Sequence, residues 1–196
     1  MASIGALPVT RRPLWARLIF ALDAYLRQQA GVFEYSDATD CVFRVHVGRL
    51  SENVLLADGT VGRIGDRVID LHFWNERIPI QLTARNSLAW GCRFNRCVDK
   101  SLRALAQFLK SNIELADVNI IRANTNLRVL DRIAERHGFE AVVLTRSNRT
   151  RLRRLGENIL FWFLALACGA CTVQPKYFWR SRKLLYLSRR ALMVQD

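Results

Sequence analysis

Acidic residues are scarce in this chain of 196 residues. Aspartate and glutamate total 17 against 30 lysines and arginines, which leaves a formal net charge of +13 and a pI near 10.6. Such an imbalance favours anionic partners, namely phospholipid, nucleic acid or a phosphorylated ligand. The segment from Ala141 to Asp196 holds eleven basic and two acidic residues, a net charge of +9. This asymmetry predicts a surface-binding C-terminal segment.

The sequence also has no apolar run long enough to cross a bilayer comfortably. The most apolar stretch, Ile159 to Val173, has fifteen residues, whereas a spanning helix needs about 20. Basic and aromatic residues bracket this stretch, as they would an interfacial anchor. A buried core helix explains the same composition, so both interpretations stay open. A cleaved signal peptide is not expected, because the residues after Arg12 are amphipathic.

Signatures of established chemistry are missing as well. Five cysteines, an odd number, argue against a disulfide framework and for a reducing compartment. No serine-nucleophile motif, Walker loop or metalloprotease helix is present, and no set of ligands has metal-site spacing. The sequence lacks RNP, zinc-finger and helix-turn-helix signatures, which disfavours nucleic acid as the partner. We therefore predict no metal.

The clearest structural pattern lies between Asp58 and Pro79. Two tight-turn dipeptides, Asp58-Gly59 and Gly65-Asp66, punctuate short apolar segments and predict a hairpin that leads into a strand over Arg67 to Trp74. Side chains alternate between the two faces of a strand. One predicted face carries Val68, Asp70, His72 and Trp74, and the other carries Ile69, Leu71 and Phe73.

Candidate catalytic residues follow from this strand. His72 lies on the same predicted face as Asp70, and a carboxylate can hold a histidine in the tautomer that acts as a base. Glu76 and Asn75 follow at the end of the strand, where open α/β sheets tend to bind ligands. A structurally satisfied histidine explains the same pattern without any chemistry. His46, on a predicted strand from Cys41 to Leu50, has its side chain on the polar face of that strand. The two imidazoles with Asp70 or Glu76 could make a metal site, although nothing in their spacing enforces convergence.

Helical periodicity appears at both ends of the chain. Apolar residues from Pro13 to Gln29 recur at helical spacing. Such a helix either packs on the domain or lies in a bilayer interface. The remaining predicted elements are a loop around Trp90-Gly91-Cys92, a helix over Val98 to Asn112, a strand over Val118 to Arg122, a helix over Asn126 to His137, a strand over Phe139 to Leu144 and a basic amphipathic helix over Phe178 to Met193.

Two resemblances enter at this point. The unit from Val118 to Leu144 resembles the closing strand-helix-strand part of the GNAT N-acyltransferase fold, through Asn124 or Asn126 and through Gly138-Phe139-Glu140. The longer span from about Cys41 to Leu144 is similar to the bacterial YkoP-like domain, which occurs alone or attached to polysaccharide deacetylase domains. The residues that carry this second likeness are Asp58 to Thr60, Gly65-Asp66, Asp70 to Phe73 and Asn75.

The GNAT likeness implies acyl-CoA as a cofactor, and the sequence departs from it at the cofactor loop. GNAT enzymes hold the pyrophosphate on a glycine-bearing loop that opens the central helix. The equivalent loop here is predicted near Arg93 to Lys100 and has no glycine, so bulkier side chains would obstruct the backbone approach. Arg93, Arg96 and Lys100 could still attract an anion to that helix start, or they form an ordinary solvated surface. Asn124 is a further candidate ligand-binding residue.

These observations predict an α/β fold with a GNAT-like mixed sheet flanked by helices. We expect a YkoP-like domain over residues 32–145, an amphipathic helix within residues 1–31 and a basic, apolar helical segment over residues 146–196. The expected function is a noncatalytic accessory or binding module in cell-envelope or polysaccharide metabolism. Its expected partners are an anionic lipid or glycan-linked ligand and a polysaccharide-modifying protein, at the inner face of the cell membrane. The alternative is a divergent acyltransferase that uses acyl-CoA.

Overall fold

A mixed five-stranded sheet organises the computed structural model, which describes residues 14–74, 77, 87–125, 128–142 and 183–194. The strand order is β1-β4-β5-β7-β6, and only the central β4–β5 pair is parallel. This confirms the predicted α/β class with a mixed sheet. The bounds are β1 Phe43–Arg49, β4 Arg67–Phe73, β5 Ile120–Thr125, β6 Glu140–Val142 and β7 Lys183–Ser188.

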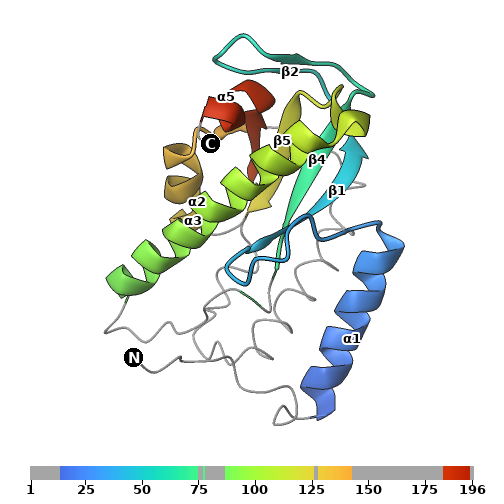
Figure 1. Cartoon of the computed structure of the whole chain (residues 1–196), viewed down its shortest axis with the longest axis vertical. Coiled ribbons are helices and arrows are strands. Elements are labelled where there is room, and N and C mark those ends of the chain that lie inside the picture. The colour runs from blue at the N-terminus through green and yellow to red at the C-terminus, as the bar shows by residue number, and fades with distance from the viewer. Residues whose placement is uncertain (1–13, 75–76, 78–86, 126–127, 143–182, 195–196) are drawn as a thin grey trace.

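Helices cover one face of this sheet. The long helix α2 (Ser87–Ser111) crosses the strands diagonally (Figure 1), and α3 (Arg128–Arg136) and α5 (Arg189–Val194) pack on the same side. Gly138, with φ +76°, ends α3 as predicted, because its N–H donates to the carbonyl of Glu135. The main core lies between these helices and the sheet, and its fully buried members include Val45, Ile69, Leu102, Leu105, Leu109, Ile121, Leu187 and Leu192.

A hairpin covers one end of the opposite face. Strands β2 (Val54–Leu55) and β3 (Val61–Gly62) form a separate two-stranded sheet, joined by the predicted turn at Asp58-Gly59. A Cβ on Gly62 would collide with side-chain atoms of Ile120 and Leu50, so only glycine lets the hairpin pack this closely. The second apolar cluster formed there contains Leu50, Val54, Leu56, Val68, Ile120 and Tyr186.

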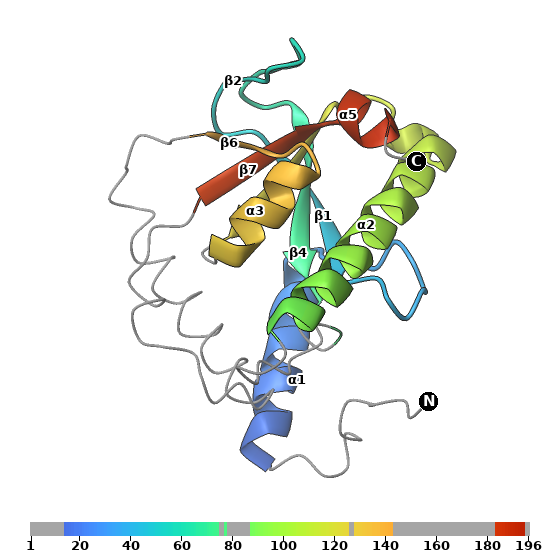
Figure 2. The ribbon, with the colours of Figure 1, turned by 90° about the vertical axis from the view of Figure 1, so that its left-hand side faces the viewer.

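The predicted N-terminal helix is present as α1 (Leu14–Gln29). Gly31, with φ +66°, follows its end, and an isolated bridge between Phe33 and Val45 ties the next residues to the edge of the sheet. In both views of the ribbon α1 extends away from the end of the sheet (Figure 2). Its leucines are exposed rather than packed on the sheet.

Two predicted elements were wrong. Trp90-Gly91-Cys92 is part of α2 and not a turn. The buried residues that indicate this helix begin at Phe94, but the helix itself already starts at Ser87. The predicted helix over Phe178 to Met193 was wrong for Lys183–Ser188, which form β7. Leu185 and Leu187 of β7 face the main core, while Leu184 and Tyr186 face the hairpin cluster, so both faces of β7 are apolar and its sequence carries no strand alternation. The sheet therefore extends past residue 145.

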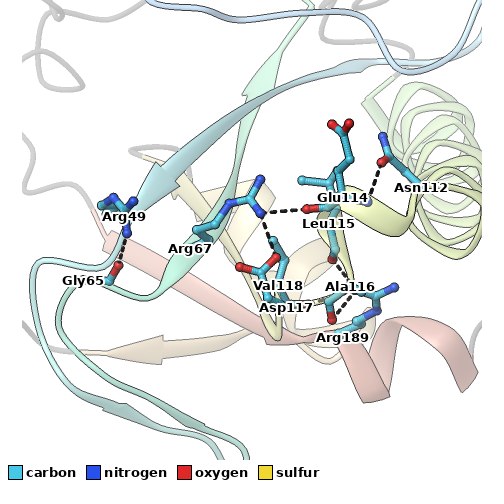
Figure 3. A network of polar contacts seen from close by, with 10 residues as sticks. All are labelled: Arg49, Gly65, Arg67, Asn112, Glu114, Leu115, Ala116, Asp117, Val118 and Arg189. Atoms are coloured by element: carbon cyan, nitrogen blue, oxygen red, sulfur yellow. Dashed lines mark hydrogen bonds and ion pairs between the residues drawn. The ribbon is translucent and has the colours of Figure 1, made fainter.

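Arginines fix the connection between α2 and β5, which contains the short 3-10 helix η3 (Ile113–Leu115) (Figure 3). The Arg189 guanidinium donates to the carbonyls of Leu109 at 2.7 Å and Leu115 at 2.6 Å. Arg67 donates to the carbonyl of Glu114 at 2.7 Å and pairs with Asp117 at 2.8 Å. These side chains satisfy carbonyls that the end of a helix leaves without an intrahelical donor.

Candidate functional site

A row of polar side chains crosses the sheet on the face opposite α2. The register places His46 of β1 beside Asp70 of β4, Asp70 beside Arg122 of β5, and Arg122 beside Tyr186 of β7. Glu140 of β6 completes the row beside Tyr186. Neighbours in register have side chains on the same face of a sheet. We call these five residues the polar row.

An ion pair forms the centre of the polar row. Arg122 Nε donates to Asp70 Oδ1 at 2.5 Å and Arg122 Nη2 donates to Asp70 Oδ2 at 2.8 Å. Each side chain is 17% exposed. The hydrogen bonds to Asp70 raise the pKa of Arg122. A two-point Arg–carboxylate pair of this kind is strong and fixes the orientation of both groups.

His46 extends the pair toward solvent. Its Nδ1 lies 3.4 Å from Asp70 Oδ2, and its side chain is 35% exposed. The ring of His72 lies 6.4 Å from that of His46, centroid to centroid, in an edge-on arrangement. Gly48 makes room for this contact, because a Cβ there would lie 2.5 Å from Asp70 Oδ2. Asp70 therefore orients His46 and Arg122 together.

The other end of the polar row fastens the hairpin to the sheet. Tyr186 donates to Glu52 Oε1 at 2.6 Å, and burial together with that hydrogen bond raises the pKa of Tyr186. Glu140 accepts from the backbone N–H of Ala57 at 3.0 Å. The Ser188 hydroxyl donates to Asp58 at 2.5 Å, which lowers the pKa of Asp58. These contacts are structural, so the part of the row available to a ligand is the His46 end.

The predicted site residues divide between these places. His72 is exposed on β4, and Asn124 is exposed near the end of β5. The β4–β5 ladder ends at Leu71 and Ala123, although β4 runs on to Phe73 and β5 to Thr125. His72 and Asn124 therefore lie where the two central strands stop pairing with each other. Glu76 and Asn75 lie outside the described residues, and their predicted roles stay predictions.

Trp74 shares the polar face but contributes no open surface. It is 6% exposed. The guanidinium of Arg44 lies 4.1 Å from its ring centroid, and that of Arg77 lies 3.3 Å away. Arg44 also pairs with Glu34 at 3.0 Å. Cation–π stacking and ion pairing explain this cluster as a structural one.

The three basic residues predicted at the start of a helix lie elsewhere. Arg93, Arg96 and Lys100 are within α2, one and a half turns or more beyond its first residue, Ser87. They are exposed, and Lys100 pairs with Asp40 at 2.6 Å. Backbone N–H groups inside a helix are bonded to its carbonyls, so these positions provide no phosphate cradle. Their role as ligand-binding side chains stays a prediction.

Arg122 and Tyr186 are site residues that the sequence analysis did not assign to the site. Arg122 is separated from Asp70 by 52 positions, and Tyr186 from Glu52 by 134. Local periodicity carries no information about such long-range register. The one available signal was the charged residue at position 122, directly after the two apolar residues Ile120 and Ile121.

Comparison with known proteins decides the family. The YkoP domain matches residues 16–195, which is almost the whole chain. The chain belongs to the YkoP domain family. No curated protein and no solved structure matches it. Within the described part of this YkoP protein, no group of three or more His, Cys, Asp or Glu side chains could hold a metal, and no helix is long and apolar enough to span a membrane.

Proposed function

We propose that this YkoP protein is a noncatalytic binding module that recognises an anionic group at the His46 end of the polar row. The Asp70–Arg122 pair carries this proposal. Arg122 donates to both oxygens of Asp70, which fixes the carboxylate in one orientation. The pair holds His46 in place, next to the exposed His72. A prebuilt polar surface of this kind suits recognition.

The ligand class follows from charge. The imidazoles of His46 and His72 lie near each other and offer ring N–H donors, and the chain carries a net charge of +13. An anionic lipid headgroup or an anion attached to a glycan meets both conditions. We propose a role in cell-envelope or polysaccharide metabolism, peripheral on the inner face of the membrane, together with a polysaccharide-modifying partner. The free thiols of Cys41, Cys92 and Cys97 support a reducing compartment.

A divergent GNAT-type acyltransferase is the second candidate, and one observation favours it. The parallel β4–β5 ladder ends two residues before either strand does, which is the arrangement expected where central strands separate. In this alternative His72 or Glu76 would serve as the base. The residues that lead into α2 and form its first turn argue against it, because residues 77–90 contain no glycine that would let a backbone cradle approach a pyrophosphate.

Binding measurements on the full chain separate the two candidates. The recognition proposal expects salt-sensitive binding to phosphatidylglycerol vesicles or to soluble glycerol phosphate, and it expects no heat of binding with acetyl-CoA. His72→Ala should weaken the anion binding several-fold, about 1 kcal/mol for one charge-assisted contact. Arg63→Ala is the control, since Arg63 is exposed directly after β3 of the hairpin and is not part of the polar row. Binding of acetyl-CoA together with acyl transfer that His72→Ala abolishes would establish the enzyme instead.

The two anion probes also distinguish the source of the ligand. Binding to vesicles alone indicates that the headgroup must be presented on a surface. Binding to glycerol phosphate alone indicates a soluble or glycan-linked anion. If neither probe binds at low salt, recognition of an anionic group is refuted.

A further inference from the structure

Helix α1 exposes a row of large apolar side chains. The exposed fractions are 75% for Leu14, 71% for Leu18, 51% for Leu22, 58% for Tyr25 and 43% for Leu26. We call these five residues the α1 leucine row. Large apolar side chains exposed together on one element mark an interaction surface far more often than single exposed residues do.

The row occupies one side of the helix. Leu14, Leu18 and Leu22 follow at intervals of four, and Tyr25 follows three residues later. Such spacing places side chains above one another along a helix. A helix of 16 residues is about 24 Å long. The leucine row is therefore a continuous apolar stripe along most of the helix.

We propose that α1 lies in the plane of an anionic bilayer and inserts the leucine row among the lipid headgroups. This rests on the proposed peripheral membrane association and names the surface that carries it out. Arg17 and Arg27 of α1 outnumber its one acidic residue, Asp23, and Arg17 is exposed. Basic residues beside an apolar stripe are what interfacial helices use to bind anionic lipid.

A second copy of the chain is a poorer occupant of the same stripe. Two copies that each carry a net charge of +13 repel each other, and this repulsion opposes association through α1. An anionic bilayer reverses the sign of that electrostatic contribution. Charge complementarity therefore selects the bilayer.

This placement brings the polar row to the membrane surface. A Cβ on Gly31, just past the end of α1, would lie 3.8 Å from Cδ2 of His46. The exposed end of the polar row therefore lies at the C-terminal end of α1. If α1 rests on the bilayer, His46 faces the layer of headgroups, where an anionic group is presented.

The test compares two leucines of equal exposure. Leu18 of α1 and Leu55 of β2 are each 71% exposed. Leu18→Asn should lower binding to vesicles of phosphatidylcholine and phosphatidylglycerol about tenfold or more, the range expected when one leucine is no longer buried in lipid. Leu55→Asn should bind as the parent protein does. Cosedimentation of the full chain with vesicles measures both, and circular dichroism checks that both variants are folded.

The outcomes separate the inference from the function on which it rests. No binding of the parent protein to these vesicles at low salt refutes membrane association itself. Equal binding by parent, Leu18→Asn and Leu55→Asn refutes only the role of α1. Sedimentation equilibrium without lipid provides the last arm: a dimeric parent protein that Leu18→Asn converts to a monomer would assign the leucine row to a second copy and overturn the proposal.

Discussion

Replacing Asp70 with asparagine tests the ion pair on which the site depends. Asparagine keeps the size of the side chain but removes the charge that neutralises Arg122. The Arg122 side chain is 17% exposed, so most of its guanidinium would stay out of water without a counter-charge. Removing one partner of a buried pair costs about 3–5 kcal/mol. Because partial exposure lowers this penalty, we expect Asp70→Asn to lose about 2–3 kcal/mol of unfolding free energy.

A second ion pair provides a matched control. Arg67 and Asp117 are 2.8 Å apart, but their side chains are 32% and 55% exposed. Water solvates both groups when the pair is broken, and exposed pairs of this kind contribute about 0–1 kcal/mol. Asp117→Asn should therefore change stability by less than about 1 kcal/mol, although it removes the same charge.

Urea unfolding followed by circular dichroism measures both variants. A third variant, Asp70→Asn combined with Arg122→Gln, should recover part of the loss, because no uncompensated cation remains. The reasoning is refuted if Asp70→Asn and Asp117→Asn have the same unfolding free energy within about 0.5 kcal/mol. It is also refuted if the double replacement costs the sum of the two single ones, since additivity would mean that the two side chains do not interact.

Three further predictions use stability as the readout. Gly48→Ala would place a Cβ 2.5 Å from Asp70 Oδ2 and should cost about 1–3 kcal/mol by urea unfolding, because the carboxylate must move off its partners. Arg189→Met should cost about 2–3 kcal/mol, since buried carbonyls lose their donor, whereas the exposed Arg190→Met should stay within about 0.5 kcal/mol. The raised pKa of Tyr186 keeps it protonated in the folded state above the ordinary tyrosine value of about 10. Its contribution is therefore complete below pH 10 and is lost progressively above it, and Tyr186→Phe should flatten the alkaline stability profile.

Local signals were sufficient for most of the fold. Turn dipeptides at Asp58-Gly59 and Gly65-Asp66 located the hairpin, and both glycines have positive φ values, +83° and +92°. Alternation assigned the two faces of β4 correctly, because one face packs on the helices and the other lies in the hairpin cluster and the polar row. Apolar and polar residues alternate in the sequence wherever one side of an element is buried and the other is not, so such elements could be predicted.

The two errors have different physical causes. β7 packs against apolar clusters on both faces, so Leu184, Leu185 and Leu187 give no alternation that distinguishes a strand from a helix. The first turns of α2 contain Gly91, and a single glycine costs a long helix only about 1 kcal/mol. Packing over the later turns outweighs that cost.

The candidate site was predictable only in part. The sequence indicated the face of β4 that carries Asp70 and His72, but the partner of Asp70 lies beyond the whole of α2. Parallel pairing of β4 with β5 brings Arg122 to it. His46 reaches the same carboxylate through antiparallel pairing with β1. Register is a property of the assembled sheet, so no local pattern could have identified these partners.

The net charge of +13 includes basic residues that are paired within the fold, and these must be set apart from the exposed ones before a binding surface can be identified. Arg44, Arg67 and Arg122 have carboxylate partners, and Arg189 is bonded to carbonyls. Replacing these arginines should reduce stability and leave the salt dependence of vesicle binding unchanged.

Exposed arginines on the outer side of α2 should behave in the opposite way. Arg93 and Arg96 are exposed, and each can contribute about 1 kcal/mol of attraction to an anionic surface without stabilising the fold. The double replacement Arg93→Gln with Arg96→Gln should therefore weaken vesicle binding at low salt while unfolding free energy stays the same. Since apolar insertion is insensitive to salt, the binding that persists at high salt should depend on Leu18 and not on these arginines.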